Sequence, residues 1–207
     1  MMKYFTLIVL LFLFSCGNKE DIMLPKAATT IVKNVDDLSP IYIFFRTNGK
    51  DTLAEVNRKN SIISTNWILN IDKRLPMRLV IPEIMKLQKK KREEKAHKNE
   101  KAENYYSYAD SIGKNLAFIP FTNVYYKMEK PIGTVIYINK KNEILIDNNI
   151  VKREDLKKYL LKLKDESKEV TFCFDKQISY GSYLQNKIFI ESLIPSKANV
   201  ERDEFVF

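Results

Sequence analysis

Short runs of apolar residues, separated by polar turns, recur along most of this chain and predict β-strands. Residues 41–45 and 116–121 are rich in β-branched and aromatic types, which favours buried strands. Residues 41–45 and 51–56 flank Asn48 and Gly49, and an Asn-Gly pair supplies the positive φ angles of a type I′ turn. The pattern therefore predicts a β-hairpin. Further strands are expected at residues 62–71 and 124–127.

Two prolines interrupt the strand pattern and indicate a helix. Pro76 and Pro82 follow the strand expected at 62–71. Proline suits the first turn of a helix, because the N–H group that it lacks has no partner there. We therefore expect a helix that begins near Glu83, with a charged helical excursion over residues 83–101.

The pattern is more regular after Pro131. Residues 134–138 and 143–146 are expected strands, and residues 147–149 form a tight turn, in which Asp and Asn tolerate the left-handed region. Strands are also expected at 170–174 and 204–207, and a second helix at 180–194. The first helix of this part has apolar residues at i, i+3, i+4 and i+7, namely Leu156, Tyr159, Leu160 and Leu163.

These elements predict an α+β protein in two parts. Residues 38–128 form a strand-rich region, and residues 131–207 form a domain with the order β-β-α-β-α-β. Once the first 15 of the 207 residues are removed, 192 remain, which suits one or two compact domains.

Segments of residues 131–207 resemble the periplasmic domain of ExbD and TolR. The resemblance lies in 135–138, 143–151 and 156–163, and in a strand that ends at Asp175 before Tyr180 and Gly181 open a helix. It implies the fold described above and a place in the cell envelope, where that family couples inner-membrane proton flow to the outer membrane. The family's amino-terminal transmembrane helix and its functional aspartate have no counterpart here, so a proton-driven role is not implied. The family's polar helix cap is also replaced, by Lys152 or Arg153.

A faint internal repeat accompanies this pattern. Ile-Tyr-Ile at 41–43 and Ile-Asp-Lys at 71–73 echo Ile-Tyr-Ile at 136–138 and Phe-Asp-Lys at 174–176. The two separations differ by eight residues, 30 against 38. We interpret the similarity as chance between strand-rich segments rather than as two related subdomains.

The first residues are typical of an export signal. Lys3 precedes an apolar stretch at 4–14, and a cationic start with a short apolar core is what a secretory signal peptide requires. The stretch is about half the roughly 20 residues of a membrane-spanning helix. Cys16 follows Leu-Phe-Ser and resembles the lipobox of bacterial lipoproteins, which implies lipid on its sulfur and removal of residues 1–15.

The anchor predicts a location in the envelope. Residues 16–37, with Pro25 and small polar residues, are interpreted as a tether. Gly17 rather than Asp follows Cys16, which favours the outer membrane, and Lys-Glu-Asp at 19–21 resembles a short surface-export signal. The periplasmic and surface faces both stay open. The membrane is therefore an expected partner through the lipid anchor.

Positive charge is concentrated in one segment. Residues 86–101 hold eight basic and three acidic residues, whereas residues 130–207 hold 14 and 12. One interpretation is a solvated helix or excursion, because charge runs usually face water. The other is an electrostatic contact with a partner, which makes Lys89, Lys90, Lys91 and Arg92 candidate contact residues. Nucleic acid is not an expected partner of an exported chain.

Reactive constellations are scarce. The single histidine, His97, lies in the charged run, where nothing would fix its tautomer, so histidine-based catalysis and a zinc site are not expected. Five glycines leave no phosphate-binding loop, and no cofactor is expected. Cys173 stands in an apolar strand and is interpreted as buried. Asp72 and Asp175 are the candidates for a carboxylate-only glycan hydrolase.

The preferred interpretation is a non-catalytic envelope lipoprotein that docks a protein or cell-wall partner, with Asp175 and Tyr180 as further candidate contacts. A glycan hydrolase and a surface adhesin that uses the basic segment are the alternatives. No oligomeric state is indicated.

Overall fold

The computed structural model describes residues 21–96, 98–165, 170–193 and 202–207. Within them the chain is α+β, as expected, with two mixed sheets and three helices. Cys16, the expected signal peptide and His97 lie outside the described residues. The helices are α2 (Met77–Glu93), α3 (Arg153–Asp165) and α4 (Tyr180–Leu193).

The first sheet has the order β1-β5-β4-β2-β3, with β6 paired to β5. Its strands are β1 (Lys26–Ala27), β2 (Leu38–Asn48), β3 (Asp51–Asn57), β4 (Asn66–Ile71), β5 (Asn104–Asp110) and β6 (Asn115–Pro120). The β2–β3 hairpin is confirmed, but its loop is Gly49 and Lys50, because Asn48 pairs with Asp51. Of these two residues only Gly49 has a positive φ, which fits a type II′ turn rather than type I′.

The second sheet has the order β10-β9-β8-β11-β12-β7. Its strands are β7 (Val124–Lys127), β8 (Thr134–Ile138), β9 (Ile144–Ile146), β10 (Asn149–Val151), β11 (Val170–Phe174) and β12 (Arg202–Val206). The tight turn expected at 147–149 is present, with positive φ at Asp147 and Asn148. β7 belongs to this sheet, because it pairs in parallel with β12. The second half therefore begins with β7, before the expected start at 131.

The two sheets repeat one topology. β1, β5, β4, β2 and β3 follow the same order and directions as β7, β12, β11, β8 and β9. Helices α2 and α4 make the equivalent crossovers, from β4 to β5 and from β11 to β12. The interpretation of the sequence repeat as chance is therefore wrong. The spacing differs because β10 and α3 stand in the second half where the first half has only the turns of residues 58–65.

Reciprocal main-chain hydrogen bonds join the halves at the loops that precede α2 and α4. The amides of Met77 and Arg78 donate to the carbonyls of Ile178 (2.9 Å) and Lys176 (2.8 Å), and those of Tyr180 and Gly181 to Leu75 (2.7 Å) and Lys73 (3.0 Å). Met77 and Tyr180 are 103 residues apart, and so are Asp72 and Asp175, so the contact has approximate twofold symmetry. Because the buried hydrophobic residues of both halves form one cluster, the halves share a core.

Helix α2 begins earlier than expected. Pro76 takes an extended conformation as the N-cap, and Met77, Val80, Ile81 and Ile84 form the buried face. Pro82 lies inside the helix and not in its first turn. The tertiary packing of this face overrides the local preference of proline for a helix start.

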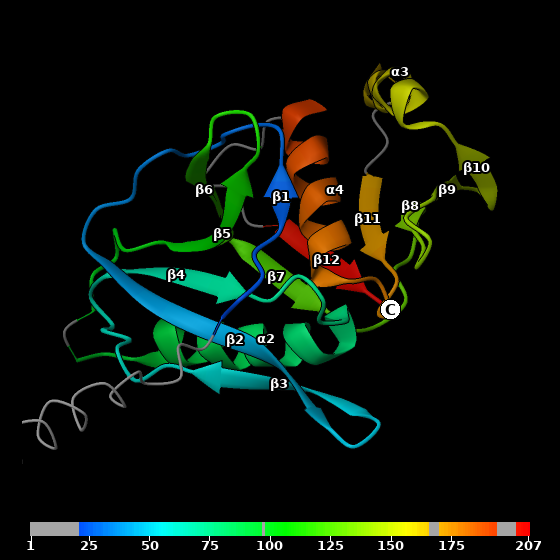
Figure 1. Cartoon of the computed structure of the whole chain (residues 1–207). Coiled ribbons are helices and arrows are strands. Elements are labelled where there is room, and N and C mark those ends of the chain that lie inside the picture. Colours follow the sequence, from blue (N-terminus) through cyan, green and yellow to red (C-terminus); the bar gives the residue numbers. More distant parts are fainter. Residues whose placement is uncertain (1–20, 97, 166–169, 194–201) are drawn as a thin grey trace, which may run out of the picture.

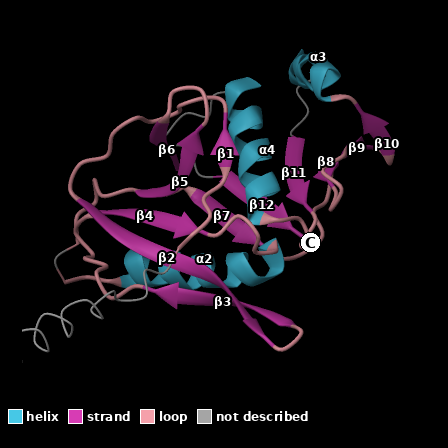
Figure 2. Cartoon of the chain, viewed as in Figure 1, coloured by secondary structure: helices cyan, strands magenta, loops and turns pink. Residues whose placement is uncertain are grey.

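The segment interpreted as a tether is part of the fold within the described residues. β1 adds to β5. The Met23 amide donates to the Asp72 carboxylate (3.3 Å), and the Met23 carbonyl accepts from the Lys73 amide (2.8 Å). Helix α4 stands between β1 of the first sheet and β11 of the second, whereas α2 lies across the first sheet near β7 (Figures 1 and 2).

Candidate functional site: a basic groove between α2 and β7

The four consecutive cationic residues of α2 point in different directions, because successive side chains on a helix are about 100° apart. Lys89 and Lys90 are exposed on the surface. Lys91 is buried, and Arg92 lies against β7. The structure thus separates a set that the sequence grouped together.

Lys91 is part of the interior. Its Nζ atom donates to the carbonyls of Thr65 (2.9 Å) and Glu103 (3.1 Å) and to Oδ1 of Asn104 (3.0 Å), and lies 5.0 Å from the centre of the Trp67 ring. Burial lowers the pKa of Lys91 to about 8. Its hydrogen bonds connect the last turns of α2 to the starts of β4 and β5, so the side chain is not available to a partner at the surface.

Two other side chains of α2 hold the start of β7. Nε2 of Gln88 donates to the carbonyls of Phe121 (3.3 Å) and Val124 (3.0 Å). The guanidinium of Arg92 donates to the Thr122 carbonyl (3.0 Å) and lies 4.1 Å from the centre of the Tyr125 ring. A cation over an aromatic ring is attracted by the negative face of the ring. These contacts fix the distance between helix and strand.

A groove of about 520 Å³ runs between α2 and β7. Its lining combines four cationic side chains with two exposed methionines and the half-buried Tyr125. It comprises Pro82, Met85, Lys86, Gln88, Lys89 and Arg92 from α2, and Tyr125, Tyr126, Lys127 and Met128 from β7 and the residue after it. None of these ten residues is acidic. Two glutamates stand beside the groove, where Glu83 pairs with Lys86 at 2.7 Å and Glu93 with Lys89 at 3.8 Å.

β7 is the edge strand of the second sheet. Within the described residues it pairs with β12 on one side, and no strand pairs with it on the other. An unpaired edge presents main-chain donors and acceptors to any extended chain that approaches it. The groove therefore offers both charge and hydrogen-bonding groups to a ligand.

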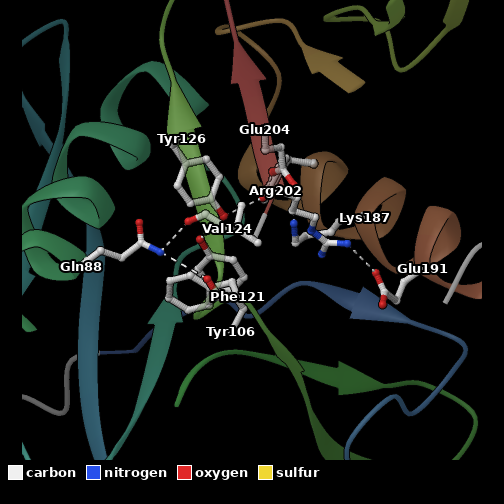
Figure 3. Close-up of polar contacts among 10 residues, drawn as sticks. Gln88, Tyr106, Phe121, Val124, Tyr126, Lys187, Glu191, Arg202 and Glu204 are labelled. Carbon is white, nitrogen blue, oxygen red and sulfur yellow. Dashed lines mark hydrogen bonds and ion pairs between the residues drawn. The ribbon is translucent and has the colours of Figure 1, made fainter. Parts of the chain in front are cut away.

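A buried chain of hydrogen bonds lies behind the groove (Figure 3). The hydroxyl of Tyr126 contacts the hydroxyls of Tyr106 (2.6 Å) and Tyr183 (3.0 Å), Tyr183 donates to Glu204, and Lys187 forms an ion pair with Glu204. Burial raises the pKa of all three tyrosines well above the usual value, and burial lowers the pKa of Lys187. These hydrogen bonds fix the inner side of β7, so the edge of the strand is held rigidly.

Asp175 and Tyr180 do not lie in the groove. Asp175 accepts the amides of Gln177 (2.7 Å) and Lys140 (3.3 Å) and so caps the loop before α4. Tyr180 is fully buried, and its hydroxyl is the one buried side-chain polar atom without a hydrogen-bond partner among the described residues. Tyr180 is therefore not available as a surface contact, whereas Asp175 is half-buried.

Asp72 is the counterpart of Asp175 in the first half. Arg74 binds its carboxylate through two nitrogens, at 2.8 and 2.7 Å. Burial of Asp72 acts to raise its pKa, but the hydrogen bonds from Arg74 and Met23 outweigh it and lower the pKa below the usual value. A general acid for glycoside hydrolysis needs a raised pKa, so Asp72 does not suit that role.

A second hollow, of about 360 Å³, lies on the face of the second sheet that the helices leave uncovered. Its lining joins two aromatic side chains to a polar rim. It is formed by Lys130, Pro131, Gly133, Val135, Tyr137, Leu145, Asp147, Asn148, Cys173 and Phe207. Cys173 is 2% exposed, which confirms its burial, and burial raises the pKa of its thiol to about 11. An inert thiol rather than a nucleophile follows.

In the described part of the chain, no group of three or more His, Cys, Asp and Glu side chains is arranged to hold a metal ion. No helix in these same ranges has the length and apolar composition of a membrane span.

Comparison of the chain with protein-family models, curated proteins and solved structures finds no match. The function must therefore be inferred from the chemistry of the site.

Sequence reasoning found the helix wall of the groove and missed the strand wall. Tyr125, Lys127 and Met128 were not singled out, because only the parallel pairing with β12 makes 124–127 an edge strand. The alternation of Val124 and Tyr126 inward with Tyr125 and Lys127 outward was the available signal, and it gives the strand without its neighbours.

Proposed function

We propose that this chain is a non-catalytic docking module of the bacterial cell envelope, anchored by lipid on Cys16, that binds an envelope protein in the groove between α2 and β7. The observation that carries the proposal is the combination of four cationic side chains with the edge strand β7 in one groove. Strand edges recognise extended segments through main-chain hydrogen bonds, and cations add selectivity.

The ExbD and TolR resemblance supports an envelope role without a motor role. The second half has the order β-β-α-β-α-β apart from the additional short β10 and the preceding β7. We extend the resemblance to the fold of this half and not to proton-driven work, since the transmembrane aspartate of that family has no counterpart in the chain.

Site-specific photocrosslinking in intact cells tests the docking role. A photoreactive residue at Met85 lies in the groove, whereas one at Ile112 lies on an exposed turn of the first half, 73% exposed. We expect one defined envelope protein to be captured from Met85 and not from Ile112. Equal capture from both positions, or none from Met85, would contradict the proposal.

Membrane fractionation tests the anchor. The Cys16→Ala chain should remain unprocessed or become soluble, because the apolar stretch at 4–14 is too short to hold a span. A product of mature length that stays on the membrane would refute lipid attachment at Cys16.

The hollow on the second sheet supports a second candidate, a cell-wall glycan. Tyr137 and Phe207 offer aromatic faces, and Asp147 and Asn148 offer polar groups at the rim. The apolar faces of sugar rings pack on aromatic side chains, and hydrogen bonds fix their orientation. Titration with soluble peptidoglycan fragments should show binding that Phe207→Ala weakens and Met85→Ala does not.

A further inference from the structure

We propose that the ligand of the groove is an acidic, extended peptide segment that adds to β7 as a further strand. This inference rests on the proposed docking function and names the chemistry of the partner.

The main chain of β7 is oriented for strand addition. The Val124 amide donates to the Phe121 carbonyl (3.1 Å), and the Val124 carbonyl accepts from Gln88, so the main chain of this residue points away from β12. Alternate residues of a strand point their N–H and C=O groups to the same side. The main-chain groups of Tyr126 and Met128 therefore face the groove as well.

Tyr126 lines the groove with its main chain. Its side chain is 4% exposed, and its hydroxyl lies in the core between Tyr106 and Tyr183. What this residue offers to a ligand is therefore one N–H donor and one carbonyl acceptor, the pair that an added strand uses.

The dimensions suit a short extended segment. The α2 wall from Pro82 to Arg92 is about 15 Å long at 1.5 Å per residue. An extended peptide rises about 3.3 Å per residue, so roughly four or five residues fill this length. A single small anion would leave most of this length empty.

The charge of the groove selects an acidic ligand. Lys86, Lys89 and Arg92 come from the helix wall and Lys127 from the strand wall, so a bound segment has cations on both sides. Met85 and Met128, 39% and 42% exposed, add flexible apolar surface between them. Methionine adapts to varied apolar partners. A segment with carboxylates and interspersed apolar residues matches this surface.

An anionic membrane surface is the competing explanation for the cations. It needs neither the strand edge nor the methionines, and it would respond to any exposed lysine of α2. Lys90 provides the matched control, because it is exposed on the same helix and does not line the groove.

The test uses the full chain in detergent and a fluorescein-labelled octapeptide that alternates Glu and Val, read by fluorescence anisotropy. We expect binding that weakens with salt, because exposed charges are screened over about 8 Å at physiological ionic strength. The same peptide with alternate amides N-methylated, and a Lys-Val peptide, should not bind. Comparable binding of either control peptide would overturn the proposal.

Paired variants locate the peptide. Lys89→Glu with Lys127→Glu should weaken binding about tenfold, as expected from two exposed charge pairs turned repulsive, whereas Lys90→Glu should change it less than about twofold. Met128→Pro, which removes a main-chain donor, should weaken binding more than Met128→Ala. Equal effects within either pair would refute strand addition in the groove. Thermal unfolding of each variant ensures that folded protein is compared.

Vesicles of anionic phospholipid give the outcome for the membrane explanation. If the chain without its lipid anchor, Cys16→Ala, binds these vesicles and loses this binding equally in Lys90→Glu and Lys89→Glu, the cations serve the membrane and the peptide proposal is wrong. A protein captured from Met85 in cells, together with absent binding of the Glu-Val peptide, would retain the docking function and refute only the acidic strand.

Discussion

The two halves of the molecule share a backbone and differ in the chemistry that the backbone buries. Superimposing Asp72 on Asp175 places Ile84 of α2 at the position of Lys187 in α4. The ladder register likewise places Tyr106 of β5 at the position of Glu204 in β12. An aliphatic and an aromatic side chain in the first half thus correspond to a buried ion pair in the second.

The difference shows which contacts determine the architecture. The reciprocal hydrogen bonds between loops 72–78 and 175–181 involve main-chain atoms only, so they are independent of side-chain identity. Buried positions on α2 and α4 were free to become apolar in one half and ionic in the other. Packing constrains volume and hydrogen bonding more than it constrains residue type.

Breaking the ion pair should give the largest effect. Glu204→Ala leaves Lys187 buried without its carboxylate and removes the acceptor of Tyr183, so we expect a loss of about 3 to 5 kcal/mol in the free energy of unfolding. Urea unfolding measures it. The double variant Lys187→Met with Glu204→Leu replaces the ion pair with two apolar side chains, where the first half has Ile84 and Tyr106, and should recover most of the loss. If it is no more stable than the single variant, the halves are not interchangeable at this position.

Replacing Lys91 should give the next largest loss of stability. The comparison with Lys90 separates a buried lysine from an exposed one in the same run of charges. Lys91→Met removes a donor from three buried acceptors, of which the Glu103 carbonyl keeps the Trp67 amide, and should cost about 2 to 4 kcal/mol. Lys90→Met should stay within about 0.5 kcal/mol. Similar losses for both variants would show that Lys91 is not held as described.

The lowered pKa of Lys91 adds a dependence on pH. Because the folded pKa is about 8 and the usual value is 10.5, the unfolded chain binds more protons between these pH values. The free energy of unfolding should therefore rise with pH, by about 2 kcal/mol from pH 7 to 9.5, relative to Lys91→Met. A flat difference between the two proteins would contradict the pKa.

Gly181 tests the symmetry of the junction. A methyl group there would lie 3.1 Å from Cβ and 3.2 Å from the carbonyl of Lys73, so Gly181→Ala must displace the main chain and should cost about 1 to 3 kcal/mol. Its counterpart, Arg78, already has a side chain and is exposed, so Arg78→Ala should be nearly neutral. Equal costs would mean that the junction is more symmetric than these contacts indicate.

The smallest loss of stability is expected at Cys173, whose counterpart in the first half is Asn70. Asn70 has a hydrogen bond from Ser107 at 2.7 Å. The hydroxyl of Cys173→Ser enters an apolar strand, so we expect a loss of about 1 kcal/mol. Native thiol labelling, followed by mass spectrometry of the peptide, should find Cys173 slow to react. Rapid, complete labelling would contradict its burial.

The sequence pattern predicted those elements that depend on residues close together in the sequence. The β2–β3 hairpin, α3 and β11 follow from turn residues and periodicity within a few positions, and they were found. The start of α2 was misplaced because Met77 and Val80 are buried by tertiary contacts that no local pattern contains. The strand wall of the groove depends on a pairing with β12 far along the chain, for the same reason.

The burial of Lys91 was within reach of the sequence. It stands seven residues after Ile84 and four after Leu87, on one helical face. The run of charges concealed this face, because lysine was read as a polar residue. Its methylene stem can nevertheless pack in the interior as an aliphatic side chain does. The sequence alone could not show the places of the candidate contact residues Asp175 and Tyr180, because these depend on the conformation of the loop before α4. Asp175 caps a turn there, and Tyr180 fills the core.

The reciprocal loop contact joins two halves of a single polypeptide, so its formation is a unimolecular equilibrium. Dilution cannot separate the halves, and their docking free energy is independent of how many copies the cell makes. The groove takes one wall from each half, α2 from the first and β7 from the second, so its two walls are held together at any concentration of the protein.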